Sequence, residues 1–496
     1  MHSDKKNSFW LAFQFVISLL VSLVTLKLNL LHFGTEIFGS WILIAAIWGF
    51  GSALDFGFGT AVIKYVAEFN RHSKTEINEL LSSIFFVFIL IGTVIFILGL
   101  TFGNIIFFGK SGAVPVIYRE NMRLPFLILA ITFLLQYVGV FFRSVFEGMN
   151  NFVISSRISL VQNITILVGV IIIYQLKSSI LILSFIYFTA GIIVLFLYLV
   201  LFRKYYVDFK LKASYFNLTL VRKIISFSFS VQLSNIFAAI VDPAIKIIVS
   251  NYYQISYVSI YETARRFTLA ITGLFFAAFK IILPKTSELR TLNEYQEFLK
   301  GKAVGYTRVG VTYSGVFYGV LSLPIVLFIK YWFGYQDATL IFLMLSLPEA
   351  INNAGYTNYN FLIGIGKTSI VAFVQFINLL FIFVGLTLGF VLLKNNLGFM
   401  GYFISDVIVN ALILYFVKKY SKISITGFFI QAKLYKTLIQ VMILSILILV
   451  IFYTHINLMF VLGTYTLIMI FLFVNDIISY FNILKSFLAE KLGINT

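Results

Sequence analysis

Cysteine is absent from this chain, and histidine, proline and acidic residues are scarce. The 496 residues include no Cys, four His, six Pro and 19 Asp and Glu. The absence of cysteine excludes disulfides, thiolate metal sites and thiol catalysis. His2, His32, His72 and His455 are scattered along the chain, so we expect neither a histidine metal cluster nor a cofactor.

Charge is also scarce, and apolar residues take its place. Charged residues make up 11% of the chain and apolar residues 60%, with a mean hydropathy of +0.99. A soluble domain is about half apolar and about a quarter charged, so the composition excludes a soluble fold. A bilayer span needs about 20 mostly apolar residues. Segments of this kind cover 9–31, 38–66, 80–101, 123–146, 152–175, 179–202, 224–249, 255–283, 303–329, 338–363, 367–393, 398–418, 434–455 and 457–483.

These segments predict an all-α polytopic membrane protein with about 14 transmembrane helices, since each is about the length of a bilayer span. A basic connection after the sixth segment suggests two six-helix bundles followed by two C-terminal helices. We expect an N-terminal lobe at 1–202, a cytoplasmic basic linker at 203–223, a C-terminal lobe at 224–420, and two extra helices with a short cytoplasmic tail at 421–496.

The two predicted lobes look like weak sequence copies of each other. Leu26-Lys27-Leu28 returns 219 residues later as Ile245-Lys246-Ile247, and Gly148 at one helix end returns 216 residues later as Gly364. Six helices separate the copies, so both have the same orientation and we expect a pseudo-two-fold axis along the membrane normal. Chance similarity among apolar helices remains the alternative.

Basic residues outnumber acidic ones by 37 to 19, which gives a net charge of +18. Such an excess can indicate nucleic-acid binding, but here Lys and Arg gather in alternate loops and at the termini. That alternation marks the cytoplasmic side of a membrane protein. We therefore expect both termini to be cytoplasmic, and no nucleic-acid partner.

Polar side chains follow one face of two predicted helices at spacings of three and four residues. A stripe of this kind either lines a wet cavity or forms hydrogen bonds between helices. Its continuity favours a cavity wall. The stripe in 9–31 consists of Gln14, Ser18, Ser22, Thr25 and Asn29, and that in 224–249 includes Gln232 and Asn235.

Asp242 and Lys246 lie one helical turn apart, with Pro243 between them. A charge at the bilayer centre costs about 3 kcal/mol on insertion scales, so we expect the two side chains to meet on one face. Two interpretations remain open. The pair can be self-neutralising near the outer helix end, or Asp242 can exchange its lysine for a proton or a sodium ion.

Glu262, Arg265 and Arg266 lie about a third of the way into the segment 255–283. Glu262 can neutralise one arginine three or four residues away, which leaves one positive charge over. Arginine stays protonated and binds phosphate through a planar set of donors. We therefore predict an anion site at Arg265 and Arg266, with Lys246 as a third cation.

Three further charged residues are candidates for the same cavity. Arg143 shares a helix face with Glu147, with which we expect it to pair at the inner rim. Asp55 could oppose a basic group across the N-terminal lobe. Glu349 shares its face with Asn352 and is the candidate acid of the C-terminal lobe. With Asp242 and Glu262, these two acids complete our candidates for coupling or cavity carboxylates.

Phe38-Gly39-Ser40-Trp41, followed by Leu54-Asp55-Phe56-Gly57, resembles the polysaccharide (O-antigen and teichoic-acid) flippase family. Tyr257-Val258-Ser259-Ile260-Tyr261 before Ala264-Arg265, and the turns at Gly148 and Gly364, are similar too. That family belongs to the multidrug/oligosaccharidyl-lipid/polysaccharide exporter superfamily. The resemblance implies two six-helix bundles around an alternately open central cavity.

The resemblance also implies a function without enzymatic chemistry. Undecaprenyl-diphosphate-linked oligosaccharide would move across the cytoplasmic membrane, for O-antigen or other surface polysaccharide, by alternating access of a cationic cavity. An H⁺ or Na⁺ gradient often drives such transport. Arg265, Arg266 and Lys246 would contact diphosphate or acidic sugar. Expected partners are this lipid-linked substrate, the lipid bilayer and polysaccharide polymerase machinery, with the transporter itself a monomer.

Two other functions fit part of the sequence. A multidrug or organic-cation antiporter of the same superfamily predicts net-acidic cavity walls, whereas the deep residues here lean basic. A membrane polysaccharide polymerase needs a large outer loop with catalytic groups, and the longest outer connection, 102–122, has one acid, Glu120, and no histidine.

Overall fold

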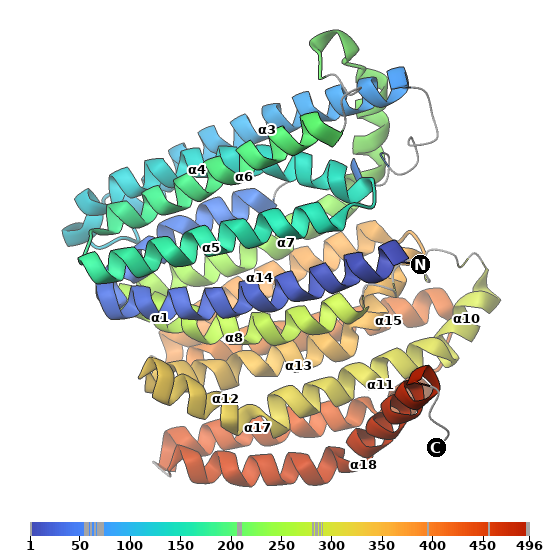
Figure 1. The fold of residues 1–496 in the computed structure, drawn as a ribbon. Coiled ribbons are helices and arrows are strands. Elements are labelled where there is room, and N and C mark those ends of the chain that lie inside the picture. The colour runs from blue at the N-terminus through green and yellow to red at the C-terminus, as the bar shows by residue number, and fades with distance from the viewer. Residues whose placement is uncertain are drawn as a thin grey trace. The chain divides into compact units, whose positions relative to one another are not determined.

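The computed structural model describes residues 2–53, 59, 62–63, 66, 74–205, 211–279, 282, 286, 289, 291–393, 396–454 and 457–492. Every regular element within these residues is a helix (Figure 1). The all-α fold class predicted from the sequence is confirmed. The chain divides into two compact units, Met1–Glu262 and Thr263–Thr496. The predicted lobe boundary at 203–223 stays a prediction, because this division falls within a later helix.

Within its described residues, the first unit contains six long α-helices, one short 3₁₀-helix and the beginning of a further α-helix. A break occurs inside the first of them, where Gly34 adopts φ 72° and ψ 176°. Glycine alone tolerates such a left-handed φ without strain. The helices are α1 (His2–Ala53), α3 (Lys74–Phe108), α4 (Val116–Gly148), α5 (Phe152–Leu176), α6 (Ile180–Tyr205), the short η1 (Ala213–Tyr215), α7 (Leu218–Tyr252) and α8 (Ile255–Phe279).

Helix α4 is the centre of the first unit. It packs lengthwise against α6 and α3, and α1 packs against α5 (Figure 1). Aromatic rings fill these interfaces: Tyr137 of α4 contacts Phe88 of α3 and Phe133 of its own helix, each at 5.4 Å between ring centroids. Within a bilayer the hydrophobic effect does not drive helices together, because lipid is as apolar as their side chains. Close packing of this kind holds the helices together instead.

The second unit contains a bent segment in which two π-helical turns interrupt the α-helix. The pieces before and after Leu321 meet at 47°. π-turns are rare and often mark functional positions. In order, the helices are α10 (Leu292–Lys300), α11 (Lys302–Gly315), η2 (Val316–Val320), α12 (Ser322–Phe328), η3 (Ile329–Phe333), α13 (Gln336–Gly364), α14 (Thr368–Leu393), η4 (Asn396–Phe399), α15 (Met400–Ser421), α16 (Ile425–Gln431), α17 (Leu434–Thr454) and α18 (Leu458–Leu492).

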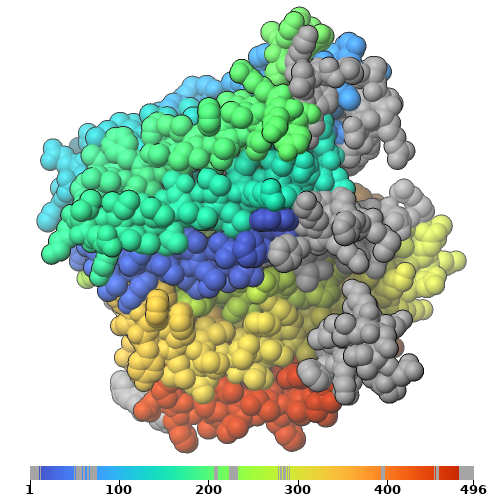
Figure 2. All heavy atoms as spheres, in the orientation of Figure 1, coloured from blue at the N-terminus to red at the C-terminus, as the bar shows by residue number. Residues whose placement is uncertain are grey.

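Helix α13 is the centre of the second unit, where it packs against α11, α15 and α17. Its run from Ile341 to Ala350 is buried throughout. Helices α17 and α18 pack on each other, and Figure 2 shows their side chains as one continuous surface. α18 also packs on the π-turn η2. The two helices expected to be extra are thus packed directly onto the rest of this unit.

The exposed side chains are those of a multi-pass membrane protein. Ten helices of the described chain are long and apolar enough to span a bilayer, or eleven with the bent pair. The expected number of about 14 is compatible with this count. The helix α1 is divided by a break at Gly34. The helices α8 and α13 are 25 and 29 residues long but contain more polar residues. Large apolar residues such as Leu90, Ile105 and Phe471 are more than half exposed, as lipid-facing positions require.

The two turns noted as possible repeats have matching surroundings. At Gly148 a side chain would collide with Ile63 and Val66, and at Gly364 it would collide with Thr286. Both glycines lie at a helix end, and each contact is made to a segment of its own unit that lies 78 to 85 residues before it. This correspondence supports the predicted internal duplication.

Candidate functional site

The first candidate site is a cluster of ionised side chains on α7 and α8 of the first unit. Lys246 Nζ lies 2.7 Å from Asp242 Oδ2 and 2.9 Å from Glu262 Oε2. Tyr261 donates a hydrogen bond from its hydroxyl to Asp242 Oδ1 over 3.1 Å. The Asp242–Lys246 pair expected from the spacing therefore forms, and Glu262 joins it from the next helix.

Lys246 is 7% exposed, whereas the Asp242 side chain is 33% exposed. The ammonium is therefore buried in the protein and is held by two carboxylates. Burying an ion costs several kcal/mol, and the partner charges must offset that cost. Asp242 remains the more accessible member of the cluster.

The second candidate site lies in the second unit, around Glu349 of α13. Arg265 donates from Nη1 to Glu349 Oε1 over 2.6 Å, and Thr272 donates from Oγ1 to Glu349 Oε2 over 3.0 Å. Tyr318, in the π-turn η2, is 2.8 Å from Thr272 Oγ1. Glu349 is 4% exposed. Its carboxylate thus has a charge partner on one oxygen and a hydroxyl network on the other.

These contacts pair two of the three predicted site cations with carboxylates. Arg265 and Lys246 are each bound by carboxylates and largely buried. Arg266 is half-buried at the next position of α8. An anion that binds Arg265 or Lys246 must therefore compete with a carboxylate already in place. The assignment of these three cations to substrate binding stays a prediction.

A further acid lies close to the second site, on α15. Asp406 is 1% exposed, and its backbone carbonyl accepts a hydrogen bond from Asn410 Nδ2 over 2.9 Å. The same amide contacts Asn352 Oδ1 of α13 over 3.0 Å. Asn410 therefore ties α15 to α13.

The polar stripe of α1 forms contacts within the first unit. Ser18 Oγ accepts from Asn163 Nδ2 of α5 over 2.6 Å and from Gln14 Nε2 over 3.4 Å. Thr25 donates to the Val21 carbonyl of its own helix over 2.8 Å. At these positions the stripe serves hydrogen bonding, between helices or within one. Ser22 is half-buried, and Asn29 is buried with an Oδ1 that has no partner among the described residues.

The remaining candidates are spread over the structure. Arg143 pairs with Glu147 as expected, at 2.7 Å, but its side chain is 47% exposed. Asn235 is exposed on α7, and Gln232 belongs to the same helix. Asp55 lies outside the described residues. The structure thus groups Asp242, Lys246 and Glu262 in one cluster and Arg265 and Glu349 in the other.

The motif residues Phe38-Gly39-Ser40-Trp41 serve packing. A side chain at Gly39 would collide with the backbone carbonyl of Ile255 at the start of α8. Trp41 donates from Nε1 to Ser184 Oγ of α6 over 3.1 Å and stacks on Phe38. The glycine therefore permits a close approach of two helices, and the tryptophan ties α1 to α6.

Each of the two sites combines a buried cation, a carboxylate paired with it, and hydroxyl groups from Tyr261 or from Thr272 and Tyr318. These three hydroxyl partners could not be predicted from the sequence, because their helices meet the acids only after folding.

Residues 5–290 match the model of a family described as polysaccharide biosynthesis protein. That match covers more than half of the chain. The chain belongs to this family. It is 23% identical over 384 residues to a Shigella flexneri protein with the provisional name O-antigen transporter, a match that covers 75% of this chain and 87% of that protein.

Solved structures of membrane transporters share the fold of this family member. The lipid II flippase MurJ in an inward closed conformation superimposes with a TM-score of 0.65 at 20% identity, over 98% of this chain and 99% of that one. An inward-facing multidrug resistance transporter of the MATE family gives a TM-score of 0.60 at 13% identity, over 83% of this chain and 96% of that one.

Proposed function

We propose that this protein moves undecaprenyl-diphosphate-linked oligosaccharide repeat units across the cytoplasmic membrane, for O-antigen or other surface polysaccharide. The family described as polysaccharide biosynthesis protein and the O-antigen transporter relative support a polysaccharide role. The fold shared with a lipid II flippase supports a lipid-linked substrate. The observation that carries the proposal is the pair of buried cations at Arg265 and Lys246, each held by a displaceable carboxylate.

The proposed mechanism is alternating access with exchange of anionic partners. The diphosphate takes the place of Glu349 on Arg265, and of Asp242 or Glu262 on Lys246. Arginine suits this role because its planar donors match two phosphate oxygens. A carboxylate released in a nonpolar interior takes up a proton or a sodium ion, because an unpaired charge there is costly. Substrate movement would thereby be coupled to an H⁺ or Na⁺ gradient.

The experiment compares single and double neutral variants of the second site in a host lacking the native gene. Arg265→Gln leaves Glu349 buried and unpaired, so loss of polysaccharide in that variant could reflect loss of folding. Arg265→Gln with Glu349→Gln removes both charges together and should keep the fold. We expect this double variant to accumulate at the normal level and to make at least tenfold less surface polysaccharide.

The matched control is Arg222→Gln, which removes an exposed cation from α7. Its polysaccharide level should stay unchanged. Normal polysaccharide in the Arg265→Gln, Glu349→Gln double variant would sink the assignment, because it would make the ion pair purely structural. The same assay on Arg265→Ala with Arg266→Ala tests the neighbouring cation.

A second function has one observation in its favour, the fold shared with a multidrug resistance transporter. A multidrug or organic-cation antiporter would use the acids Asp242, Glu349 or Asp55 without a role for the arginines. Deletion of the gene would then raise sensitivity to cationic drugs and leave surface polysaccharide intact. We favour the polysaccharide substrate because the family and the O-antigen transporter relative point to it.

The remaining parts of the proposal concern location and partners. The protein acts in the inner membrane, with both termini in the cytoplasm, as a monomer beside the polysaccharide polymerase machinery. Because the sequence has no cysteine, single cysteines near either terminus can be labelled without background. Labelling by an impermeant maleimide only after cell lysis is the expected result for both ends.

A further inference from the structure

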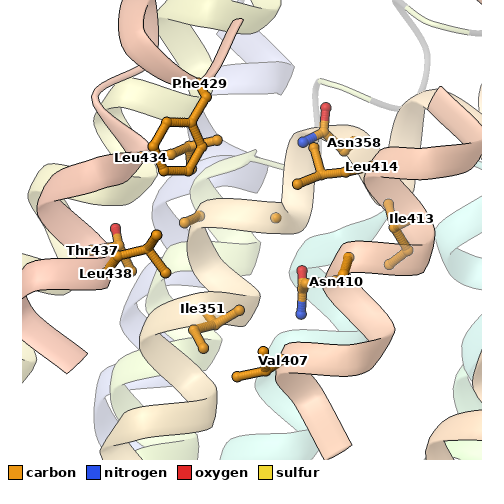
Figure 3. A pocket seen from close by; sticks show the side chains of 13 residues that line it. Ile351, Asn358, Val407, Asn410, Ile413, Leu414, Phe429, Leu434, Thr437 and Leu438 are labelled. Atoms are coloured by element: carbon orange, nitrogen blue, oxygen red, sulfur yellow. The ribbon is translucent and has the colours of Figure 1, made fainter. Parts of the chain in front are cut away.

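A pocket lies in the second unit between α13, α15 and α17 (Figure 3). Its walls are mainly apolar, from Ile351 of α13, Val407 and Leu414 of α15, and Leu438 of α17. The cavity has a volume of about 240 Å³. That is below the roughly 300–1,000 Å³ of sites that enclose a whole small molecule. The pocket therefore suits a segment of a chain that continues outside it.

Two polar atoms in this pocket lack hydrogen-bond partners. Asn358 and Thr437 both line it and are 1% and 3% exposed. Neither Asn358 Oδ1 nor Thr437 Oγ1 has a hydrogen-bond partner in the described part of the chain. A buried polar atom without a partner costs about 1–3 kcal/mol. A ligand with hydroxyl and carbonyl groups at this depth would remove that cost.

The position of these atoms along the helices matches the glycerol region of a lipid. Asn358 lies six residues before the end of α13 at Gly364, and Thr437 lies three residues after the start of α17 at Leu434. With a rise of 1.5 Å per residue, both are within about 10 Å of a helix end. Apolar walls extend from there toward the middle of the span, as an acyl chain requires.

The α15 wall of the pocket ends in a cation. Val407, Ala411, Leu414 and Lys418 follow one another at spacings of four, three and four residues, which places them on one helix face. The first three line the pocket, and Lys418 is exposed one turn further toward the helix end. An anionic headgroup would find this lysine directly beyond the polar atoms.

We propose that this pocket binds one chain of an anionic glycerophospholipid of the phosphatidylglycerol type, with its phosphate at Lys418. An ester carbonyl accepts from Thr437, and a headgroup hydroxyl donates to Asn358. The site is separate from the two ion clusters and goes beyond the proposed function. Its occupant is a bilayer lipid and not the transported substrate.

The test is a titration of the purified, detergent-solubilised protein with dioleoylphosphatidylglycerol, followed by native mass spectrometry. Dioleoylphosphatidylcholine, a zwitterionic lipid without net charge, serves as the comparison. Lys418→Gln should weaken binding about fivefold, because one lysine near a membrane surface contributes on the order of 1 kcal/mol. Lys419→Gln is the matched control, since it removes the same charge from the neighbouring, exposed position off the pocket face.

A second pair of variants tests the apolar part of the pocket. Ala411→Trp fills the pocket and should abolish saturable lipid binding, whereas Ile446→Trp, at an exposed position of α17 away from the pocket, should not. Equal effects of Lys418→Gln and Lys419→Gln would overturn the proposal. So would unchanged binding in Ala411→Trp, equal binding of both phospholipids, or displacement of the phospholipid by equimolar undecaprenyl phosphate, which would assign the pocket to a prenyl chain.

Discussion

At the scale of single residues, each buried cation is bound to carboxylates on a second helix. Lys246 of α7 reaches Glu262 of α8, and Arg265 of α8 reaches Glu349 of α13. Such pairs rarely add net stability over an apolar core, but breaking one of them is costly. The presence of such ion pairs in an apolar protein favours a role in ion or substrate exchange. Mutation can measure separately the cost of breaking a pair and the effect of removing both of its charges.

Removal of Lys246 should destabilise the first unit. Lys246→Met keeps the length of the side chain but leaves Asp242 and Glu262 without their shared ammonium. We expect a loss of about 3–5 kcal/mol, the cost of an uncompensated buried charge. Thermal unfolding in detergent measures it. Neutralising both acids as well, by Asp242→Asn and Glu262→Gln, should restore most of the stability, and failure to do so would contradict this account.

The hydroxyl of Thr272 should matter for the second site. Thr272→Val is nearly isosteric but leaves Glu349 Oε2 and the Tyr318 hydroxyl without their shared partner. We expect a stability loss of about 1–3 kcal/mol. Thr272→Ser keeps the hydroxyl and is the control, with a smaller loss from the missing methyl group. Equal melting temperatures for Thr272→Val and the unchanged protein would show that the bond contributes nothing.

At the scale of helices, the close approach of α1 and α8 depends on a glycine. A Cβ at Gly39 would collide with the Ile255 carbonyl, whereas one at Gly49, further along α1, would have no atom within 4 Å. Alanine is about 1 kcal/mol better than glycine in a helix interior. A glycine-to-alanine substitution is therefore expected to change stability in opposite directions at the two positions.

We predict that Gly39→Ala lowers the melting temperature and that Gly49→Ala leaves it unchanged or raises it slightly. Backbone atoms cannot move aside as a flexible side chain can, so α1 and α8 must separate to admit the methyl group. Overpacking of this kind costs about 1–3 kcal/mol. A Gly39→Ala variant as stable as Gly49→Ala would mean that the helices approach less closely than the structure indicates.

Helices could be predicted from the sequence because apolar length is a local property. The predicted segments 9–31 and 38–66 stop and start on either side of Gly34, where α1 breaks. The Asp242–Lys246 pair was predictable for the same reason, since one turn separates the two residues. The partner of Arg265 is 84 residues away, and the π-turn that carries Tyr318 has no sequence signal. Contacts of this kind appear only when helices pack.

At the scale of the whole molecule, α17 and α18 support the second ion cluster. Tyr465 of α18 donates from its hydroxyl to the carbonyl of Tyr318 over 3.1 Å, and Gln440 of α17 donates to that of Ser314 over 3.1 Å. Side chains at Gly315 and Gly319 would collide with Phe473 and Met469 of α18. The bent segment that carries Tyr318 to the Glu349 network is therefore packed against these two helices.

Truncation after Ser421 should accordingly remove more than two accessory helices. It exposes the packing surface of α11 and η2 and withdraws both hydrogen bonds. We expect the fragment 1–421 to aggregate on size-exclusion chromatography and to make no surface polysaccharide. Co-expression of 422–496 as a separate chain should restore a monodisperse peak and part of the activity, because helices inserted separately can still associate through their packed faces. A monodisperse and active 1–421 fragment would show instead that the bent segment keeps its shape, and the Glu349 network its Tyr318 hydroxyl, without support from α17 and α18.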